Sequence, residues 1–361
     1  MLGTKANSSR YEQLHLLVFG AGAIGAYIGG SLALQGHRVV FLEKPEVIEI
    51  VSRQGLKIHI GDDMFHVPEP ILAAKLDQAL EYGPFDAAVM ALKSYDTPGF
   101  LEILHPFAAQ IPPVLCLQNG VENEMLLADK LGSEKVIAGT VTSAVGRLGP
   151  GKVILERLRG VGIAAGNPLS SRLDYAFQQA GLQARLYASA SAMKWSKLLT
   201  NLLANATSAI LDMTPAEIFA HRDLYLLEVA QLCEALKVMQ AHQIEVVDLP
   251  ATQVRLLAFI IQRLSPRLSQ LLIRRAVGGG RGNKMPSFHI DLHSRRGMSE
   301  VDSLNGAVVR FGQKAGLETP VNRLLTDTLL GLTRGEIPLE QFSRQPEKLL
   351  SLWRSPVVSL A

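Results

Sequence analysis

The sequence predicts an α/β domain followed by an all-α domain. Up to about residue 185, short β-rich runs alternate with helix-like segments, and after that point long helical patterns dominate. Such alternation is typical of βαβ units around a mainly parallel sheet. A typical domain has about 150 residues. The 361 residues therefore predict two domains, which we place at 14–186 and 187–361.

Four apolar runs are the candidate strands of the first domain, and each is followed by a helix-like segment. They are LHLLVFG (14–20), HRVVFLE (37–43), FDAAVMAL (85–92) and PPVLCLQ (112–118). Amphipathic patterns predict the helices of the second domain at 188–210, 215–242, 248–275 and 299–316. The glycine-rich stretch VGGGRGNKMP (277–286) predicts a loop between two of these helices.

Composition excludes several classes of protein. A net charge of +3, 19% charged and 48% hydrophobic residues are typical of a compact globular chain and indicate no nucleic-acid partner. The polar N-terminus lacks the apolar run of a signal peptide, and no later stretch is apolar enough to span a bilayer. Two cysteines in apolar runs, with no histidine or cysteine at zinc-ligand spacing, predict a reducing compartment and no metal. We therefore expect a cytoplasmic protein with no membrane partner.

A glycine-rich motif follows the first predicted strand. Gly20, Gly22 and Gly25 form the pattern G-x-G-x-x-G, in which glycines permit a tight turn, close approach of a pyrophosphate and close helix packing. Ala23 and Ile24 would begin the following helix, whose N-terminal N–H groups favour phosphate. The motif predicts a Rossmann-type domain that binds a dinucleotide.

The end of the second strand gives two conflicting signals about that dinucleotide. Glu43 lies 18 residues beyond Gly25, where an acidic residue accepts the ribose hydroxyls of NAD. Lys44 follows at once and is suited to neutralise the 2′-phosphate of NADP. Which side chain turns toward the cofactor is left open by these residues alone.

Two further strand ends carry polar residues, at the edge where open α/β sheets bind their ligands. Lys93 follows the third strand, and burying a lysine there would be costly unless it had a role. Asn119 follows the fourth strand and begins an Asn-Gly turn. Both residues are candidates for contacting a cofactor or substrate.

The stretch MKWSKLLTNLLANATSAI (193–210) predicts an apolar helix with one polar stripe. Lys197, Asn201 and Asn205 are four residues apart, so they drift only about 40° per step around a helix. Lys194 borders the same face. Asparagine is a poor choice for an exposed helix interior, so we expect this stripe to line a polar site.

At this point the chain resembles the ketopantoate reductases, also called 2-dehydropantoate 2-reductases. Five motifs carry the resemblance and occur in the family's order along nearly the whole chain. They are GAGAIG (20–25), ALKSYDT (91–97), CLQNGVENE (116–124), KLLTNLLAN (197–205) and PSFHIDLHSRRGMSEVDSLNG (286–306).

The resemblance implies reduction of ketopantoate to (R)-pantoate in the route to pantothenate and coenzyme A, with NADP as cofactor and NAD possible because of Glu43. By position, Lys197 would be the general acid, and Glu300 its acidic partner and a cofactor contact. The resemblance implies a cofactor set of Gly20, Gly22, Ala23, Ile24, Gly25, Lys44, Lys93, Asn119 and Glu300, and a substrate set of Asn119, Lys197, Asn201, Asn205 and Ser287.

Departures from the family pattern leave alternatives open. The segment 291–300 is one residue longer than expected and adds Arg295 and Arg296, while Ala206 replaces a common proline. A basic amphipathic insertion at 250–284 suits a homodimer surface or an added helix better than a membrane surface. The rivals are a reductase of another 2-oxo acid, a relative of the β-hydroxyacid dehydrogenases, and a non-catalytic dinucleotide sensor.

Overall fold

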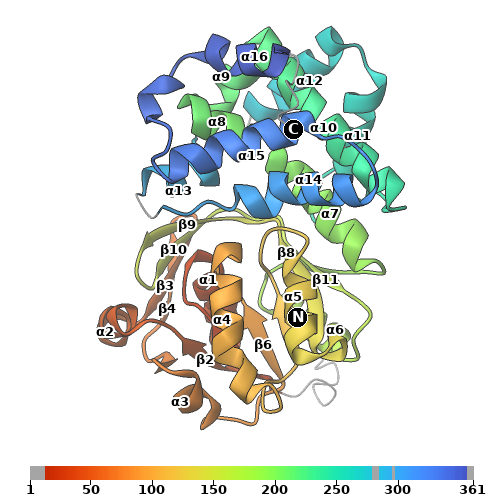
Figure 1. Ribbon diagram of the computed structural model, residues 1–361. Coiled ribbons are helices and arrows are strands. Elements are labelled where there is room, and N and C mark those ends of the chain that lie inside the picture. The colour runs from red at the N-terminus through yellow and green to blue at the C-terminus, as the bar shows by residue number, and fades with distance from the viewer. Residues whose placement is uncertain (1–12, 279–283, 295–296, 356–361) are drawn as a thin grey trace, which may run out of the picture. The chain divides into compact units, whose positions relative to one another are not determined.

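The computed structural model describes residues 13–278, 284–294 and 297–355 (Figure 1). The chain divides into two compact units. The first contains the chain up to Gln118, Glu122–Lys194 and Leu249–Thr252, and the second contains Asn119–Val121, Trp195–Asp248 and the chain from Gln253 onward. The domain boundary at 186/187 stays a prediction. The residues outside this description include the polar N-terminus, positions 279–283 of the predicted glycine-rich loop, and Arg295 and Arg296.

The first unit is built on an eight-stranded sheet. Its strands, in spatial order, are β12 (Ala184–Tyr187), β11 (Val161–Ala164), β8 (Val136–Val141), β7 (Val114–Cys116), β6 (Ala87–Met90), β1 (His15–Phe19), β2 (Arg38–Leu42) and β5 (Ile71–Ala73). The strands from β8 to β5 are parallel, and β11 and β12 run antiparallel to them. The six parallel strands have the order 3-2-1-4-5-6 of a dinucleotide-binding fold.

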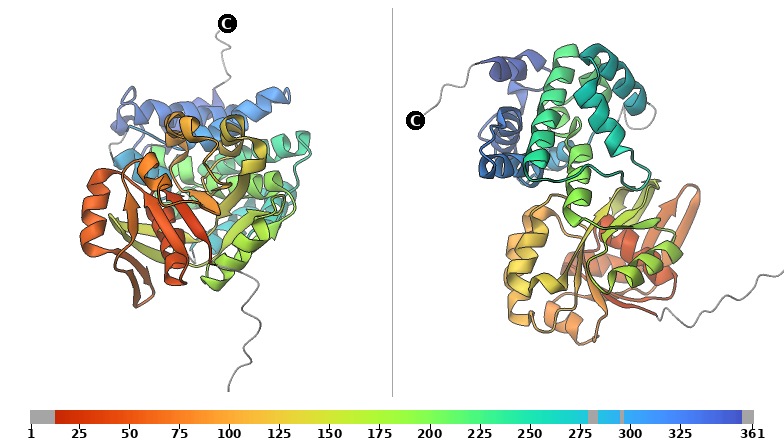
Figure 2. Two further views of the ribbon diagram at one scale, coloured as in Figure 1. Left: turned by 90° about the horizontal axis from the view of Figure 1, so that it is seen from below. Right: turned by 90° about the vertical axis from the view of Figure 1, so that its right-hand side faces the viewer.

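Helices cover both faces of this sheet. The evidence is that successive side chains of β1 are buried in two different cores. Leu16 and Val18 pack with α1 (Ala23–Leu34) and α6 (Ser170–Gln179). Leu17 and Phe19 pack on the other side with α3 (Leu76–Leu80), α4 (Thr97–Leu104) and α5 (Asn123–Leu131). The right-hand view of Figure 2 shows α4 and α5 on one side of the strands and α6 on the other. Burial on both faces explains why these strands are continuous apolar runs.

A smaller four-stranded sheet was not predicted. Its order is β4 (Asp63–Val67), β3 (Leu56–Ile60), β10 (Lys152–Arg157) and β9 (Ala144–Gly149), and α2 (Pro45–Gln54) leads into it. Ile58 and Val153 pair in register and belong to the same core as α1. The smaller sheet therefore packs over α1, the helix that begins at the glycine motif.

The second unit is helical, as predicted. Its α-helices are α7 (Ala190–Leu202, which begins in the first unit), α8 (Asn205–Leu211), α9 (Pro215–Ala220), α10 (Arg222–Ala241), α11 (Val254–Arg263), α12 (Pro266–Gly278), α13 (Ser287–His293), α14 (Ala307–Lys314), α15 (Pro320–Thr333) and α16 (Pro346–Arg354). The long helix α10 is central and contacts α9, α11, α14, α15 and α16. The predicted fold class, a Rossmann-type α/β domain followed by an all-α domain, is confirmed.

Several predicted helices are divided, and each division has a local cause. The helix expected at 215–242 breaks at His221, whose ring accepts the N–H of Leu224 and caps α10. The helix expected at 248–275 breaks before Pro266, because a proline disfavours helical backbone in the preceding residue. The helix expected at 299–316 begins with a π-helical turn, η4 (Asp302–Gly306). Such turns are rare and occur frequently at functional sites.

None of the helices within the described residues is both long and apolar enough to cross a membrane.

Candidate active site

The glycine motif has three distinct structural roles in the first unit. Gly20 has φ of +90°, which favours glycine, and its N–H donates to the carbonyl of Leu42 at 2.9 Å. A Cβ on Gly25 would lie 1.8 Å from the carbonyl oxygen of Gly20, so helix α1 can approach this turn only without a side chain. A Cβ on Gly22 would meet nothing within 4 Å.

This loop fits the pyrophosphate of a dinucleotide. Gly22 precedes the helix with open space around its α-carbon, so a ligand can approach the backbone there. Ala23 and Ile24 are the first helical residues of α1, where backbone N–H groups have no acceptor within the helix. No acidic residue lies in this first turn to repel phosphate. The positive end of the helix and these donors favour an anion.

Glu43 is held against the same loop. Its carboxylate accepts the backbone N–H of Ala21 at 2.7 Å and that of Lys44 at 2.9 Å. Lys44 is exposed at the N-cap of α2, with no side-chain capping bond. The carboxylate therefore has a fixed position beside the loop, where it can also accept a hydroxyl group, while the lysine extends from the neighbouring residue.

The ends of β6 and β7 are joined by one buried amide. The Nε2 of Gln118 donates to the carbonyls of Leu92 at 3.1 Å and Lys93 at 3.2 Å, and to the hydroxyl of Thr97 at 2.8 Å. Gln118 is 3% exposed, so these bonds hold the backbone of the strand ends in a protected setting. They fix the positions from which Lys93 and Asn119 extend.

The predicted helix at 188–210 is wrong in one important respect. Helix α7 ends at Leu202, and Ala204 has the left-handed φ of 49° before α8 begins at Asn205. Lys197 and Asn201 therefore share a helix, but Asn205 starts a new one. The expected continuous stripe of three polar residues is instead a pair followed by the first residue of the next helix.

A buried carboxylate stabilises this break, and sequence reasoning did not find it. Glu228 on α10 accepts the N–H of Ala204 at 2.8 Å and the hydroxyl of Thr207 at 2.7 Å. Gln231, one turn further, donates to Glu228 at 2.6 Å and to the carbonyl of Leu202 at 3.2 Å. Burial raises the pKa of Glu228 to about 7, against the opposing effect of these hydrogen bonds. The helix ends are thus satisfied by side chains from a distant helix.

Two pairs of predicted site residues meet within the second unit. Asn201 Nδ2 donates to Asn119 Oδ1 at 3.1 Å, and Asn205 Nδ2 donates to Ser287 Oγ at 3.4 Å. Asn205 Oδ1 also accepts the backbone N–H of Phe288 at 3.1 Å, which fixes the amide at the start of α13. Each pair therefore joins neutral hydrogen-bonding groups from two separate motifs.

The two lysines of α7 have different surroundings. Lys194 is 5% exposed, and its Nζ lies 2.7 Å from a carboxylate oxygen of Glu124 and 2.7 Å from the carbonyl of Gln118. Lys194 lies three residues before Lys197 on α7, and its side chain binds groups of the first unit. Lys197 is half-buried. Glu300 is 2% exposed and lies two residues before the π-helical turn η4.

The π-helical turn is tied to the same buried network. Asn305, within η4, is fully buried and donates to Gln231 Oε1 at 3.1 Å and to Asn322 Oδ1 at 3.0 Å. Gln231 is the residue that also holds the end of α7. The network therefore connects the segment that follows Glu300 with the segment that carries Lys197 and Asn201.

Comparison with known proteins gives the same family over most of the chain. Residues 16–167 match the family described as "Ketopantoate reductase PanE/ApbA", and residues 190–333 match its C-terminal counterpart. A 2-dehydropantoate 2-reductase of Streptococcus pyogenes is 25% identical over 86% of this chain and 95% of its own length. One from Mesorhizobium japonicum is 28% identical over 89% of this chain and 97% of its own.

Solved structures share the fold. A PanE/ApbA family ketopantoate reductase from Ralstonia eutropha has a TM-score of 0.75 at 24% identity, covering 90% of this chain and 99% of that one. D-mandelate dehydrogenase, solved with NADH and anilino(oxo)acetate, has a TM-score of 0.72 at 21% identity, covering 89% and 98%. With both family matches in place over a Rossmann-type unit and a helical unit, the chain belongs to the ketopantoate reductase family of oxidoreductases.

Proposed function

We propose that this protein is a cytoplasmic reductase of a branched 2-oxo acid, with ketopantoate as substrate, (R)-pantoate as product and NADPH as hydride donor. The proposal is carried by the two hydrogen-bonded pairs Asn119–Asn201 and Asn205–Ser287. Neutral amides and a hydroxyl suit the hydroxyl and carboxylate groups of a small oxo acid. Because these groups are neutral, the ammonium of Lys197 is the group that supplies the proton. The family relationship supports the choice of substrate.

In the proposed reaction, bound NADPH supplies a hydride to the ketone carbon. The electron pair of the C=O π bond moves to oxygen, and the Lys197 ammonium stabilises the developing charge and gives the oxygen a proton. Glu300 acts as the acidic partner of Lys197. The substrate is oriented by Asn119, Asn201, Asn205 and Ser287. Its ketone is thereby held in position for the hydride and the proton before the reaction begins.

A second candidate is an NADH-dependent reductase of another 2-oxo acid, and Glu43 favours it. A carboxylate fixed at the glycine loop accepts ribose hydroxyls and repels a 2′-phosphate. D-mandelate dehydrogenase, whose structure includes NADH, has the same fold. In the NADPH proposal, Lys44 must outweigh this repulsion. Lys93 follows β6, which is separated from β2 by β1.

Steady-state oxidation of NADPH and of NADH, with ketopantoate and a panel of 2-oxo acids, tests both candidates. Ketopantoate turnover that falls by about 10²- to 10⁴-fold in Lys197→Ala supports the proposed acid. Turnover of another oxo acid alone replaces the substrate and keeps the mechanism. Tight dinucleotide binding without turnover on any acid contradicts the enzymatic proposal and favours a dinucleotide sensor.

We also propose that the helical unit forms a homodimer through α11 and α12. The exposed apolar side chains of Leu256, Phe259, Leu268 and Leu271 lie on these two helices, each about half exposed. Exposed apolar patches are typical of interaction surfaces. Light scattering after size-exclusion chromatography should give a dimer that Phe259→Asp converts to a monomer. A wild-type monomer at micromolar concentration contradicts the proposal.

A further inference from the structure

Two short helices of the second unit, α8 and α13, contact each other at both ends of α8. At the start of α8, Asn205 contacts the start of α13 through Ser287 and Phe288. At the other end, Asp212 follows α8 with left-handed backbone angles of φ 50° and ψ 46°, which asparagine and aspartate tolerate better than most residues. Its Oδ1 lies 2.8 Å from Nε2 of His289 on α13.

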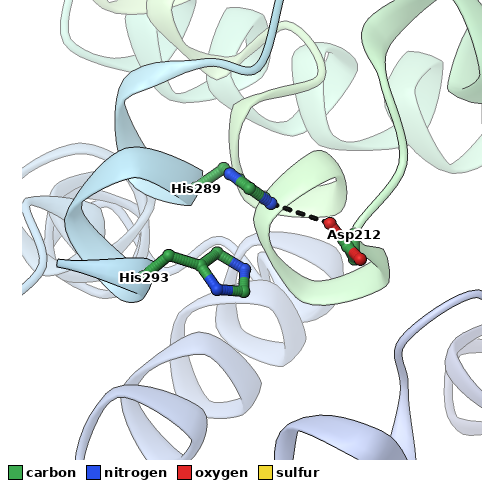
Figure 3. A group of neighbouring side chains, drawn as sticks. All are labelled: Asp212, His289 and His293. Atoms are coloured by element: carbon green, nitrogen blue, oxygen red, sulfur yellow. Dashed lines mark hydrogen bonds and ion pairs between the residues drawn. The ribbon is translucent and has the colours of Figure 1, made fainter. Parts of the chain in front are cut away.

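A second histidine completes a cluster at this end. His289 and His293 are four residues apart and therefore lie on the same face of α13, with ring centroids 4.1 Å apart. One nitrogen from each ring and one carboxylate oxygen of Asp212 all lie within 4.8 Å of one another. Figure 3 shows both rings on the side of α13 that faces the end of α8.

We propose that Asp212, His289 and His293 bind a divalent transition-metal ion such as Zn²⁺. Two imidazoles and one carboxylate form a donor set for zinc, cobalt, nickel or iron, whereas magnesium and calcium prefer oxygen ligands alone. The sequence predicted no metal, because the carboxylate lies 77 positions before His289 and the two histidines alone did not match a zinc pattern.

The distances suit coordination after a small adjustment. Ligand atoms about 2.0–2.1 Å from a tetrahedral metal are roughly 3.3 Å from each other. The Asp212–His289 contact is 2.8 Å and all separations among the three ligand atoms are within 4.8 Å, so the metal would replace one hydrogen bond and need only small shifts of the side chains. The Asp212 side chain is 45% exposed, which leaves a route for the ion and room for water ligands.

A simple aspartate–histidine pair does not account for the whole arrangement. It would use Asp212 and His289 and would not explain why the tilted ring of His293 also lies beside them, with its centroid 4.1 Å from that of His289. The hydroxyl of Ser343 lies 3.5 Å from the other Asp212 oxygen and can orient the carboxylate.

Direct titration tests this site. The full chain is treated with a chelator, dialysed, and titrated with ZnCl₂ by calorimetry and with CoCl₂ by visible absorption. We expect one ion per chain. We expect His289→Ala, His293→Ala and Asp212→Asn to weaken binding by at least about ten-fold. His105→Ala removes another exposed histidine in the first unit and is the matched control, which should bind as the wild type does.

The His293→Ala variant distinguishes loss of metal binding from loss of folding. His293 is exposed, so His293→Ala should keep the thermal unfolding temperature of the metal-free protein while losing the increase that Zn²⁺ gives the wild type. Equal zinc affinity in wild type and His293→Ala overturns the proposal. So does binding that needs millimolar metal and gives no cobalt absorption. None of these readouts depends on catalytic activity, so failure of the proposed reductase function is distinguishable from failure of the metal site.

Discussion

The backbone N–H of Ala204 donates a hydrogen bond to the buried carboxylate of Glu228 at 2.8 Å. Ala204 is the left-handed residue between α7 and α8, and the other Glu228 oxygen accepts the Thr207 hydroxyl inside α8. Glu228 therefore sets the angle at which α8 leaves α7. Asn205, the first residue of α8, is positioned by this contact, so Glu228 is a positioning residue for the proposed substrate site.

Glu228→Gln should raise the KM for the oxo acid by about ten-fold and change kcat less, because a shift in Asn205 weakens substrate binding before it affects Lys197. The matched control is Glu234→Gln on the same helix. Glu234 is also buried, but it accepts the N–H groups of Val321 and Asn322 on α15. The control should lower the free energy of unfolding and leave KM unchanged. Equal effects of the two variants on KM would refute the positioning role.

Glu228 should also make stability depend on pH. Its pKa is raised from 4.5 to about 7, so the folded state binds a proton that the unfolded state releases. This contribution is fully present below the unfolded pKa of about 4.5 and is lost as pH rises through about 7. A shift of this size corresponds to about 3 kcal/mol. Urea unfolding across this range should show the loss in wild type and a flatter profile in Glu228→Gln. Identical profiles would contradict the assignment.

The parallel sheet could be predicted because each of its main strands is an apolar run that can be recognised in the sequence by itself. The runs at 14–20, 37–43, 85–92 and 112–118 contain β1, β2, β6 and β7, which are buried on both faces and therefore continuously apolar. The smaller sheet gives no such signal. Strand β4 is exposed at four of its five residues, and its pairing with β3 depends on packing over α1.

The break at Ala204 could not be predicted, because its cause lies elsewhere in the chain. Neither glycine nor proline interrupts the stretch LLAN (202–205), and the local pattern favours one continuous helix. The break depends on Glu228, 24 positions away, whose carboxylate replaces the helical acceptor. The Asp212–His289 contact likewise joins distant segments, so a reading based on local spacing missed it.

Two glycine variants should distinguish an effect on folding stability from an effect on cofactor affinity. Gly25→Ala would place a methyl group 1.8 Å from a backbone oxygen, so the loop or α1 must move at a cost of about 1–3 kcal/mol or more. Gly22→Ala has open space and should cost less than about 1 kcal/mol, yet the methyl would lie where the pyrophosphate approaches. Urea unfolding and dinucleotide titration by fluorescence measure the two effects. Normal dinucleotide affinity in Gly22→Ala would contradict this location for the phosphates.

The preference for NADPH or NADH should depend on two adjacent side chains. Glu43→Gln removes the charge that repels a 2′-phosphate and should improve the ratio of kcat/KM for NADPH over NADH by about ten-fold. Lys44→Ala should change the ratio in the opposite direction. Lys75→Ala is the control, because Lys75 is also an exposed lysine at the N-cap of a helix in the first unit. Unchanged NADPH affinity in Lys44→Ala would remove the local support for NADP.

Two lysines three residues apart on α7 should give opposite phenotypes when each is replaced by methionine. Lys194 is buried with Glu124, so Lys194→Met leaves a carboxylate without its cation and should lower the free energy of unfolding by about 3–5 kcal/mol. Lys197 is half-buried, and Lys197→Met should retain a folded protein of near wild-type stability while losing about 10²- to 10⁴-fold in kcat. Urea unfolding and single-turnover kinetics on both variants measure these effects. If Lys197→Met unfolds like Lys194→Met, the activity loss has a structural cause, and Lys197 is no longer supported as the acid. If it is stable and fully active, the proton comes from another group.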